Sequence, residues 1–526
     1  MSTRRIAWFA VVVIGLGASG ASGPVPLAGF ARLFGLGPAA ASAAGAAPCP
    51  RRGGTLRVGI NFDFVNLDPD VSTTLPDREA WKEVFNTLVG LTADLKLVPE
   101  LAESWEFESG TRVVFHLRRG VKFQDGTDFN AQVVKFEIER KKSAGGPRVS
   151  ELASVESVDV VDPYTVRFNL KAPFSPLLAV LSDGSGMMSS PTAIAKYGSD
   201  YSRHPVGTGP FEFSEWLKDD HLTVRRNANY WEPGLPCLDE IRFVPVPDQS
   251  VKLTDLRAGA LDLIDSVQPK DVESVKRDGR LQYLEVSDLG WRSLDLNVTK
   301  PPFDNQALRQ AIAWGVDRDA IHKAILFGTG IVAQGPIAPA QPGYDPGFAP
   351  YHRDLARAKA KLAEGRQPSG FRFTVVVPQV EVREQVAEVI KEELAPLGIQ
   401  VDIQPVDFGE YIRLLTSHGF TAEMGGWSGR PDPDGNLNFL FSGTASQNVT
   451  GYNNPQVNDL LDRARIVAAL NLRVRLYQQA QGIIAGDAPS VFLFYLPQNK
   501  AAAVRVKGVL PSSDNIMRLK TVWLSQ

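Results

Sequence analysis

The chain has 526 residues, of which 44% are hydrophobic and 22% are charged, and its formal net charge is -3. This composition is typical of a globular protein and excludes a disordered or fibrous chain. The near-neutral charge, without any long basic run, excludes nucleic acid as an expected partner. Because a single hydrophobic core rarely grows past roughly 250–300 residues, we expect at least two lobes.

The first residues have the pattern of an export signal. Arg4 and Arg5 give a positive start, residues 6–16 are nearly all apolar, and small residues follow at 18–23. This order is typical of a secretory signal, and the apolar run is shorter than the about 20 residues of a membrane-spanning helix. A buried helix of a soluble protein is the alternative. We expect residues 1–48, a signal followed by an Ala-, Gly- and Pro-rich leader, to lie outside the fold, and the twin-arginine route of export stays open.

The sequence contains two cysteines, Cys49 and Cys237. After export they would meet an oxidising compartment, in which such a pair closes. Cys49 precedes the first predicted strand and Cys237 precedes another at 241–244. Two adjoining strand entrances would bring the Cα atoms within the roughly 4.4–6.8 Å that a disulfide needs. We therefore predict a Cys49–Cys237 disulfide, and two unpaired thiols are the alternative.

The first half of the chain is predicted to be rich in strands. Residues 55–60 alternate between apolar and polar side chains, which is the period of a half-buried strand. Two hairpins are predicted, one over 105–117 with a Ser-Gly turn and one over 155–170 with an Asp-Pro-Tyr turn. Between them, Asn130 is predicted to cap a helix that continues through residue 140.

In the second half, strands alternate with helices. A strand is predicted at 371–377, and the apolar residues within 382–394 recur on one face of a helix. A strand at 399–403, a helix at 407–415 and a strand starting at 420 follow. This alternation predicts an α/β lobe in which helices cover a sheet.

Motifs for several kinds of chemistry are missing from the sequence. The six histidines have no zinc-site spacing, and neither a Gly-x-x-x-x-Gly-Lys phosphate loop nor a Gly-x-Ser-x-Gly motif occurs. Gly207-Thr208-Gly209-Pro210 lacks the third glycine of a dinucleotide-binding loop. We therefore expect no metal, no cofactor and no catalysis, although a catalytic triad assembled only in space stays open.

Five ordered blocks of sequence point to a family. The longest is residues 117–131, LRRGVKFQDGTDFNA, in which Asp125-Gly126-Thr127 supplies the chemistry of a turn. The other blocks are 207–211, 226–231, 302–318 and 427–455. Together they resemble the signatures of the extracellular solute-binding proteins, family 5, the peptide- and nickel-binding type. The resemblance covers roughly residues 53–526.

The resemblance implies a fold and its division. The fold is expected to be α/β, two-lobed and periplasmic-binding-protein-like, of the large type called cluster C. The first lobe is expected to comprise about 50–290 plus 491–526, with an extra subdomain at about 95–200, and the second lobe 291–490. Ligands of such proteins bind between the lobes, and hinge closure traps them.

The resemblance also implies a function. We expect a periplasmic substrate-binding protein of an ABC importer that binds a peptide or a related small solute. The expected partners are permease and ATPase subunits, and the protein is expected to be a monomer, peripheral to the inner membrane. The alternative on the same scaffold is a ligand of another class: a metal chelate, haem, an opine or a sugar. A secreted enzyme, and a signalling or chaperone-like binding module, are the alternatives of other classes.

Candidate ligand contacts follow the strand predicted over 420–426. Trp427 offers a flat face for stacking. Near this position, peptide binders of the family usually carry an acidic residue that holds the amino group of the peptide, whereas this sequence has Arg430. The planar guanidinium suits a carboxylate or a phosphate. Asp432 is a candidate partner for an amine, or for Arg430 itself, and an exposed loop charge is the alternative for Arg430.

Further candidates come from the first lobe and the hinge. Phe62 and Asp63 follow the first strand, and Met187 lies in a Gly- and Ser-rich turn. Trp291 and Arg292 are placed where the chain is expected to pass between the lobes. Together with Arg430, these candidates predict a zwitterionic or anionic ligand.

Overall fold

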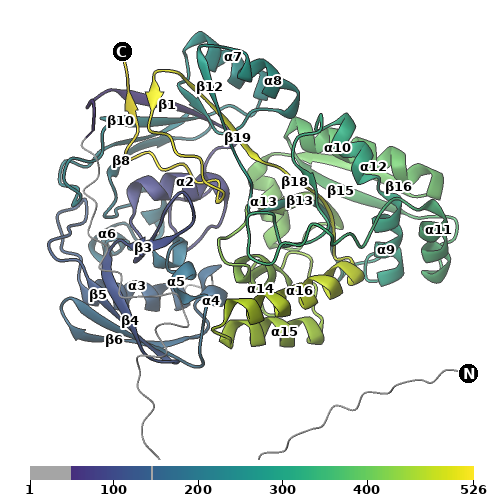
Figure 1. Cartoon of the computed structure of the whole chain (residues 1–526), viewed down its shortest axis with the longest axis horizontal. Coiled ribbons are helices and arrows are strands. Elements are labelled where there is room, and N and C mark those ends of the chain that lie inside the picture. The colour runs from purple at the N-terminus through teal and green to yellow at the C-terminus, as the bar shows by residue number, and fades with distance from the viewer. Residues whose placement is uncertain (1–48, 144–145) are drawn as a thin grey trace, which may run out of the picture. The chain divides into compact units, whose positions relative to one another are not determined.

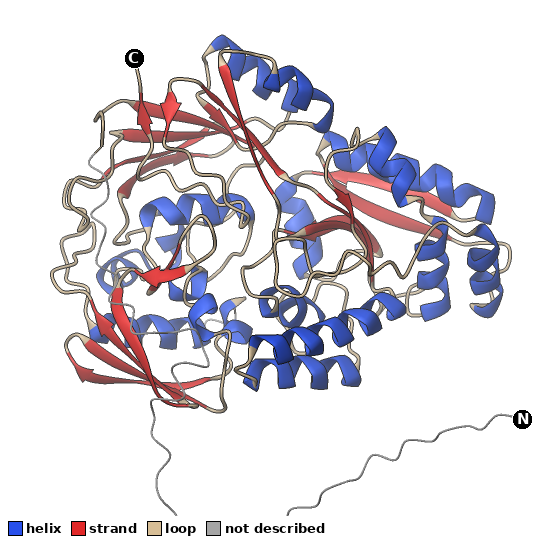
Figure 2. Cartoon of the chain, viewed as in Figure 1, coloured by secondary structure: helices blue, strands red, loops and turns tan. Residues whose placement is uncertain are grey.

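The computed structural model describes residues 49–143 and 146–526 (Figure 1). The export signal predicted for residues 1–48 lies outside this part of the chain. Three sheets, of seven, six and four strands, organise the described residues, and helices lie against them (Figure 2).

The seven-stranded sheet contains the first strand of the fold. Its central strand β1 (Thr55–Ile60), predicted from the alternation of side chains, is parallel to both of its neighbours, and the outer pairs are antiparallel. Trp81 of α2 (Leu75–Val84) is fully buried in the same core as Leu56 and Val58 of β1. In sheet order the strands are β12 (Leu281–Val286), β19 (Gln498–Ala503), β11 (Leu263–Ile264), β1, β10 (Glu240–Pro245), β9 (His221–Arg226) and β8 (Phe211–Leu217).

The two predicted hairpins form the four-stranded sheet. Its order is β4 (Ala102–Ser109), β5 (Arg112–Leu117), β7 (Thr165–Leu170) and β6 (Val155–Asp162). Helix α3 (Ala131–Ser143) packs on β6 and β7, and the Asn130 side chain caps it by accepting from the N–H of Gln132 at 2.9 Å. The hairpins and the capped helix are therefore confirmed.

The six-stranded sheet is built from the second half of the chain. Its order is β14 (Ile331–Val332), β18 (Ser490–Tyr495), β13 (Trp291–Leu296), β17 (Ala422–Trp427), β15 (Arg372–Pro378) and β16 (Gln400–Val406). Strand β13 is antiparallel to both neighbours, and β15 is parallel to both of its neighbours. The predicted strand from residue 420 begins later, at Ala422, and Phe420 packs in a separate cluster with Val376 and Tyr411.

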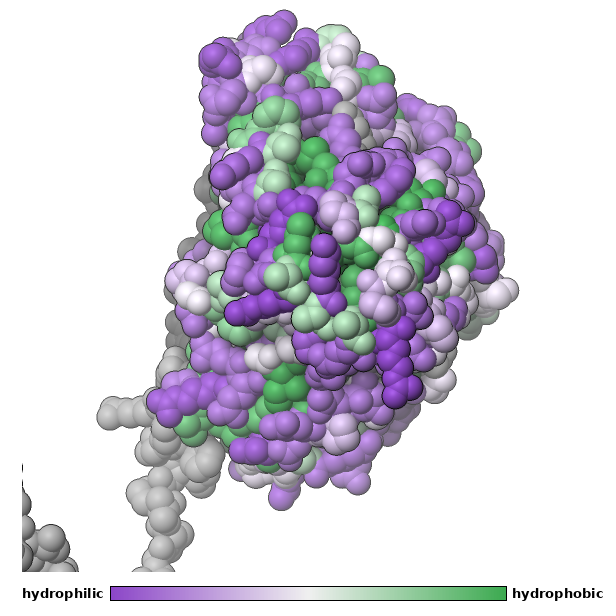
Figure 3. Space-filling model, turned by 90° about the vertical axis from the view of Figure 1, so that its right-hand side faces the viewer, coloured by the Kyte–Doolittle hydropathy of each residue, from purple (hydrophilic) through white to green (hydrophobic). Residues whose placement is uncertain are grey.

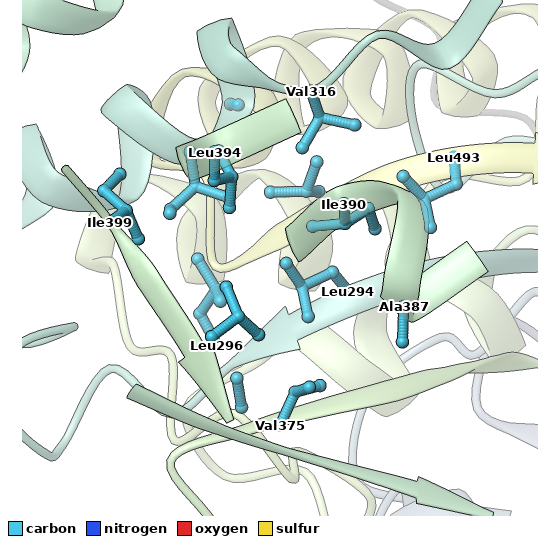
Figure 4. Close-up of a cluster of buried hydrophobic side chains, with 14 of the residues drawn as sticks. Leu294, Leu296, Val316, Val375, Ala387, Ile390, Leu394, Ile399 and Leu493 are labelled. Atoms are coloured by element: carbon cyan, nitrogen blue, oxygen red, sulfur yellow. The ribbon is translucent and has the colours of Figure 1, made fainter. Parts of the chain in front are cut away.

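The apolar face of α12 (Glu381–Leu394) explains how helices cover this sheet. Ile390 and Leu394 lie in one buried cluster with Leu294 and Val375 from the strands (Figure 4). The periodicity of 382–394 predicted this face correctly. The other helices that follow β13 are α9 (Gln306–Gly315), α10 (Arg318–Ala324), α11 (Leu355–Glu364), α13 (Phe408–Thr416), α14 (Asp434–Phe441), α15 (Pro455–Ile466) and α16 (Leu470–Asp487).

The described part of the chain also contains several shorter strands and helices. Strand β2 (Val89–Leu91) pairs with β3 (Leu97–Pro99), and β20 (Val506–Lys507) pairs with β21 (Trp523–Leu524). The remaining α-helices are α4 (Arg148–Glu151), α5 (Leu177–Val180), α6 (Pro191–Tyr197), α7 (Gln249–Ala258) and α8 (Val272–Lys276), and 3-10 turns lie at Gly184–Gly186, Gly198–Arg203, Pro269–Asp271 and Ala395–Leu397.

The chain passes between the two large sheets twice. It leaves the seven-stranded sheet after β12 and enters the six-stranded sheet at β13, and it returns between β18 and β19. We call the part built on the seven- and four-stranded sheets the first lobe, and the part built on the six-stranded sheet the second lobe. The residue boundaries given above for the lobes stay a prediction.

The structure joins Cys49 and Cys237 by a disulfide, with the Cα atoms 5.4 Å apart. Next to it, the N–H of Gly53 donates to the carbonyl of Cys237 at 2.9 Å. The bond thus ties the start of the described chain to the entrance of β10. Figure 3 shows one face of the protein, on which hydrophilic side chains predominate and hydrophobic ones lie in separated groups.

Candidate functional site

A cavity of about 310 Å³ lies between the two lobes. Both passages of the chain between the lobes contribute to its lining, through Trp291 and Arg292 on one side and Leu496 to Asn499 on the other. The first lobe adds residues that follow β1 and belong to α2, and the second lobe adds α12, α13 and the end of β17. A cavity with an aromatic and apolar lining and a few polar groups has the properties of a small-molecule site.

Antiparallel pairing brings two tryptophans to the edge of this cavity. Trp291 begins β13 and stands opposite Trp427, the last residue of β17. Trp291 is buried against Phe441 and Phe492, whereas Trp427 is partly exposed and its indole N–H donates to the carbonyl of Gly435 at 3.1 Å. The prediction that Trp427 starts a loop was therefore wrong, because the ladder with β13 extends the strand through this residue.

Two arginines line the second-lobe wall. Arg292 follows Trp291 in β13, and Arg383 lies in the first turn of α12. Burial lowers the pKa of Arg292 to about 10, and the nearby charge of Arg383 acts in the same direction. Both side chains are partly buried, so their charges are screened less than they would be in water.

Two carboxyl groups lie beside the arginines. Asp295 of β13 and Glu423 of β17 are opposite each other in the ladder, and both line the cavity. Burial raises the pKa of both groups, and the charge of Asp295 raises that of Glu423 further. The Tyr411 hydroxyl donates to Glu423 at 2.6 Å. Neighbouring buried carboxyls of this kind favour their uncharged forms.

On the first-lobe wall the charged groups are paired. Glu79 of α2 lies 3.9 Å from the Lys500 ammonium, and Asp265 pairs with Lys252. Burial raises the pKa of Glu79 to about 8, although Lys500 opposes this shift. Phe62 of the first lobe stacks on Phe408 of α13, with ring centroids 4.1 Å apart, and so closes one edge of the cavity.

Four of the predicted contacts line the cavity, namely Phe62, Trp291, Arg292 and Trp427. Arg430 and Asp432 do not, because other partners hold them. Arg430 is buried over the ring of Trp427, at 4.4 Å from the centroid, and forms an ion pair with Asp183 of the first lobe at 2.9 Å. Asp432 pairs with Arg473 at 2.6 Å.

Asp63 and Met187 also lie outside the lining. The Asp63 carboxylate accepts from the indole N–H of Trp216 at 3.1 Å and from the N–H of Asp219 at 2.8 Å, which fixes a turn of the first lobe. The side chain of Met187 is buried in the first-lobe core, and its backbone forms an isolated antiparallel β-bridge with Thr87. Asp63 was expected at the site because it follows the first strand, and Met187 because it lies in a Gly- and Ser-rich turn. Instead, other groups of the first lobe hold the Asp63 carboxylate, and Met187 packs in the core.

Sequence reasoning missed Arg383, Glu423, Tyr411 and Phe408. The predicted helices and strands contained all of them, but their helical or strand periodicity gave no reason to look for function there. One signal was available at Glu423, because a charged residue inside an otherwise apolar strand is almost never buried unless it is paired.

No group of three or more His, Cys, Asp and Glu side chains is arranged to hold a metal within residues 49–143 and 146–526. No helix in this part of the chain is long and apolar enough to cross a membrane.

Comparison with known proteins identifies relatives along most of the chain. Residues 96–448 match the model of the bacterial extracellular solute-binding proteins, family 5. The chain is 32% identical over 451 residues to the glutathione-binding protein GsiB of Shigella flexneri. This alignment covers 82% of this chain and 87% of the relative.

Two solved structures share the fold. The periplasmic binding protein DppA of Helicobacter pylori, in complex with the peptide STSA, is 29% identical with a TM-score of 0.85, over 90% of this chain and 99% of that one. AgaA of A. tumefaciens R10, in complex with agropinic acid, is 28% identical with a TM-score of 0.84, over the same shares of the two chains.

Proposed function

Since the chain belongs to the bacterial extracellular solute-binding proteins, family 5, we propose that its ligand is a small peptide or peptide-like solute held in the cavity between the lobes. The single observation that carries this proposal is the cavity of about 310 Å³, which takes aromatic and polar side chains from both lobes. A solute that contacts both lobes stabilises the conformation in which the lobes meet, because only that conformation offers both sets of contacts. Glutathione, peptide and agropinic acid ligands of the relatives are all small polar solutes of this kind.

The cellular setting is part of the same proposal. The predicted signal within residues 1–48 would export the protein to the periplasm, where it would deliver its solute to permease and ATPase subunits of an ABC importer. Sequencing the N-terminus of the fractionated protein tests the export step, and an intact Met1 in the cytosol would contradict it.

The ligand is best found by isolating it with the protein. We expect the protein purified from its own periplasm to release a peptide-like solute on denaturation, which mass spectrometry identifies. Calorimetry of the emptied protein with glutathione, the peptide STSA and agropinic acid then tests whether such solutes bind. A protein that releases nothing and binds none of the three would contradict the proposed ligand class.

The same samples separate a binding protein from an enzyme. We propose that the protein binds without catalysis, so each bound solute should be recovered with unchanged mass after long incubation. Protein-dependent conversion of a solute over many turnovers would overturn this part of the proposal.

A further inference from the structure

A second cavity, of about 380 Å³, lies within the second lobe and is separate from the cavity between the lobes. We call it the α10 cavity, because its lining comes from α10, β14, α16, the end of β18 and the segment 333–354 that joins β14 to α11. Among the described residues, none lines both cavities. Its volume falls within the roughly 300–1,000 Å³ of small-molecule pockets, so it is large enough for a ligand of its own.

Hydrogen bonds near both ends of the segment 333–354 hold it around the α10 cavity. Near its start, the Tyr495 hydroxyl donates to the carbonyl of Gly335 at 2.8 Å. At its end, the N–H of Asp354 donates to the carbonyl of Trp314 at 2.8 Å. The fold itself therefore forms this cavity.

Arg318, the first residue of α10, brings donors to the α10 cavity that have no acceptor in the described chain. The side chain is buried, and its Nε and Nη1 donate to the carbonyls of Phe492 at 2.7 Å and Ala313 at 3.1 Å. No carboxylate of the described residues lies within 4.0 Å of the guanidinium. The Nη2 atom makes no hydrogen bond to these residues and is not among the buried atoms without a partner, so its two N–H groups are open to the cavity.

Gln334 brings to the same cavity an acceptor that has no donor. Its side-chain N–H donates to the carbonyl of Tyr351 at 2.9 Å, which fixes the orientation of the amide. The other terminal atom of the amide, Oε1, is buried and accepts no hydrogen bond from the described residues. A buried acceptor without a donor costs free energy, and a donor supplied from the cavity would remove that cost.

The charges around the α10 cavity favour a neutral ligand. Asp319 and Asp345 line it at exposed positions, and neither carboxylate forms an ion pair with the described residues. These carboxylates would repel an anion bound beside Arg318, and Arg318 would repel a cation. They would hold the ammonium of a zwitterion only weakly, because water screens exposed carboxylates. A neutral hydroxyl group avoids both repulsions, and it can donate to Gln334 or accept from Arg318.

Aromatic rings complete the lining of the α10 cavity. Tyr344 and Phe348 line it and are partly exposed, so they offer flat apolar faces to the C–H groups of a ligand. We propose that the α10 cavity binds a small saccharide, whose hydroxyl groups contact Arg318 and Gln334 while its ring packs on these aromatic side chains. This site is additional to the proposed function and does not depend on it.

Saturation-transfer NMR with known saccharides tests the proposed site. Glucose, N-acetylglucosamine and maltose are the probes, and at least one of them should receive saturation from the wild-type protein. Ala349 lines the α10 cavity at an exposed position, so Ala349→Trp should fill the cavity and abolish the signal. Ala360→Trp, at an exposed position of α11 outside both cavities, is the matched control and should retain it. No signal from any of the three saccharides in the wild type, or an equal signal in Ala349→Trp, would overturn the proposal.

Charge variants test whether the ligand is neutral. Asp319→Asn and Asp345→Asn remove exposed charges and should leave the affinity for the saccharide within about twofold of wild type. Gln334→Met removes the unpaired acceptor and should weaken binding by about fivefold, as is typical for one lost hydrogen bond. Unchanged binding in Gln334→Met would contradict the proposed contact. If the amino acid alanine gives a signal that Ala349→Trp removes, and no saccharide does, the cavity binds a zwitterion and the saccharide proposal is wrong.

A third comparison separates the α10 cavity from the cavity between the lobes. Ala349→Trp should bind glutathione as the wild type does, whereas Trp427→Ala, in the cavity between the lobes, should retain the saccharide signal. Saccharide binding that Trp427→Ala abolishes and Ala349→Trp retains would place the saccharide between the lobes and contradict the proposal. Co-sedimentation with isolated cell-wall glycan distinguishes the end of a glycan from a free sugar, and Ala349→Trp should abolish either interaction.

Discussion

At the residue scale, Arg430 shows why an expected ligand contact acquired a structural partner instead. The guanidinium is buried, and burial lowers its pKa to about 9, with the nearby charge of Arg78 acting in the same direction. Asp183 opposes this effect as its ion-pair partner. Although burial alone would raise the pKa of Asp183, the charges of Arg78 and Arg430 hold it well below its usual range. The side chain that was expected to hold a carboxylate of the solute therefore holds one from the other lobe.

Glu83 supplies a residue-scale prediction about pH. Burial in α2 raises the pKa of this carboxyl to about 8, although the N–H of Leu519 donates to it at 3.1 Å and opposes the shift. In the unfolded chain the pKa of a glutamate is about 4.3. The folded state therefore binds the proton more tightly, and the contribution of Glu83 to the free energy of unfolding falls as pH rises from about 4.3 to about 8.

We expect Glu83→Gln to be more stable than wild type above pH about 8, and to lose this advantage as pH falls toward about 4.3. Urea unfolding at several pH values measures the difference. Glu392→Gln, at an exposed position of α12, is the control and should not change the slope of stability with pH. A Glu83→Gln advantage that is independent of pH would contradict the buried, proton-binding carboxyl.

At the element scale, the sequence predicted most of the strands and helices because their side-chain periods are local. The α12 face and the hairpins of the four-stranded sheet needed no long-range information. The order of strands in the six-stranded sheet depended on pairs far apart in sequence, such as β13 with β17 and β18. The candidate site was only partly predicted for this reason. Trp291 and Trp427 were each identified, but Asp295 and Glu423 become neighbours only through the pairing of β13 with β17.

The link between Cys49 and β10 gives an element-scale prediction. Titration of the denatured, unreduced protein should find no free thiol, because the structure pairs its two cysteines. The variant Cys49→Ser/Cys237→Ser should unfold with a free energy about 2–5 kcal/mol lower, as is typical for the loss of a native disulfide that closes a long loop. The wild type under reducing conditions is the matched control and should show the same loss. Two titratable thiols in the unreduced protein would contradict the bond.

At the scale of the whole described molecule, contacts between the lobes surround the cavity on several sides. The stack of Phe62 on Phe408 lies at one edge, and the hydroxyl of Thr73 donates to the Gln447 side chain at 3.1 Å. Away from the cavity, the N–H of Ser175 donates to the carbonyl of Arg465 at 2.8 Å. These contacts exist only when the lobes meet, so they add to the free energy of closure.

The Arg430–Asp183 ion pair joins the two lobes but lies outside the cavity lining, so a variant of it should change lobe closure without changing direct contacts to the solute. Arg430→Gln removes one of the two arginines that hold Asp183, and Arg78 remains at 3.0 Å from the carboxylate. A buried pair that loses one partner costs up to about 3–5 kcal/mol, and the retained Arg78 should reduce this cost. The variant destabilises only the conformation in which the lobes meet, so the fraction of closed molecules should decrease.

Affinity should therefore fall by a similar factor for every solute, with or without a carboxylate, since Arg430 does not line the cavity. Arg383 lines the cavity, and its guanidinium suits a carboxylate, so Arg383→Gln should instead weaken carboxylate solutes selectively. Calorimetry with glutathione and its dimethyl ester on both variants measures this contrast, and X-ray scattering of the solute-free proteins should show a larger radius of gyration for Arg430→Gln alone. Selective loss of the carboxylate solute in Arg430→Gln, with an unchanged radius, would show that Arg430 contacts the solute after all.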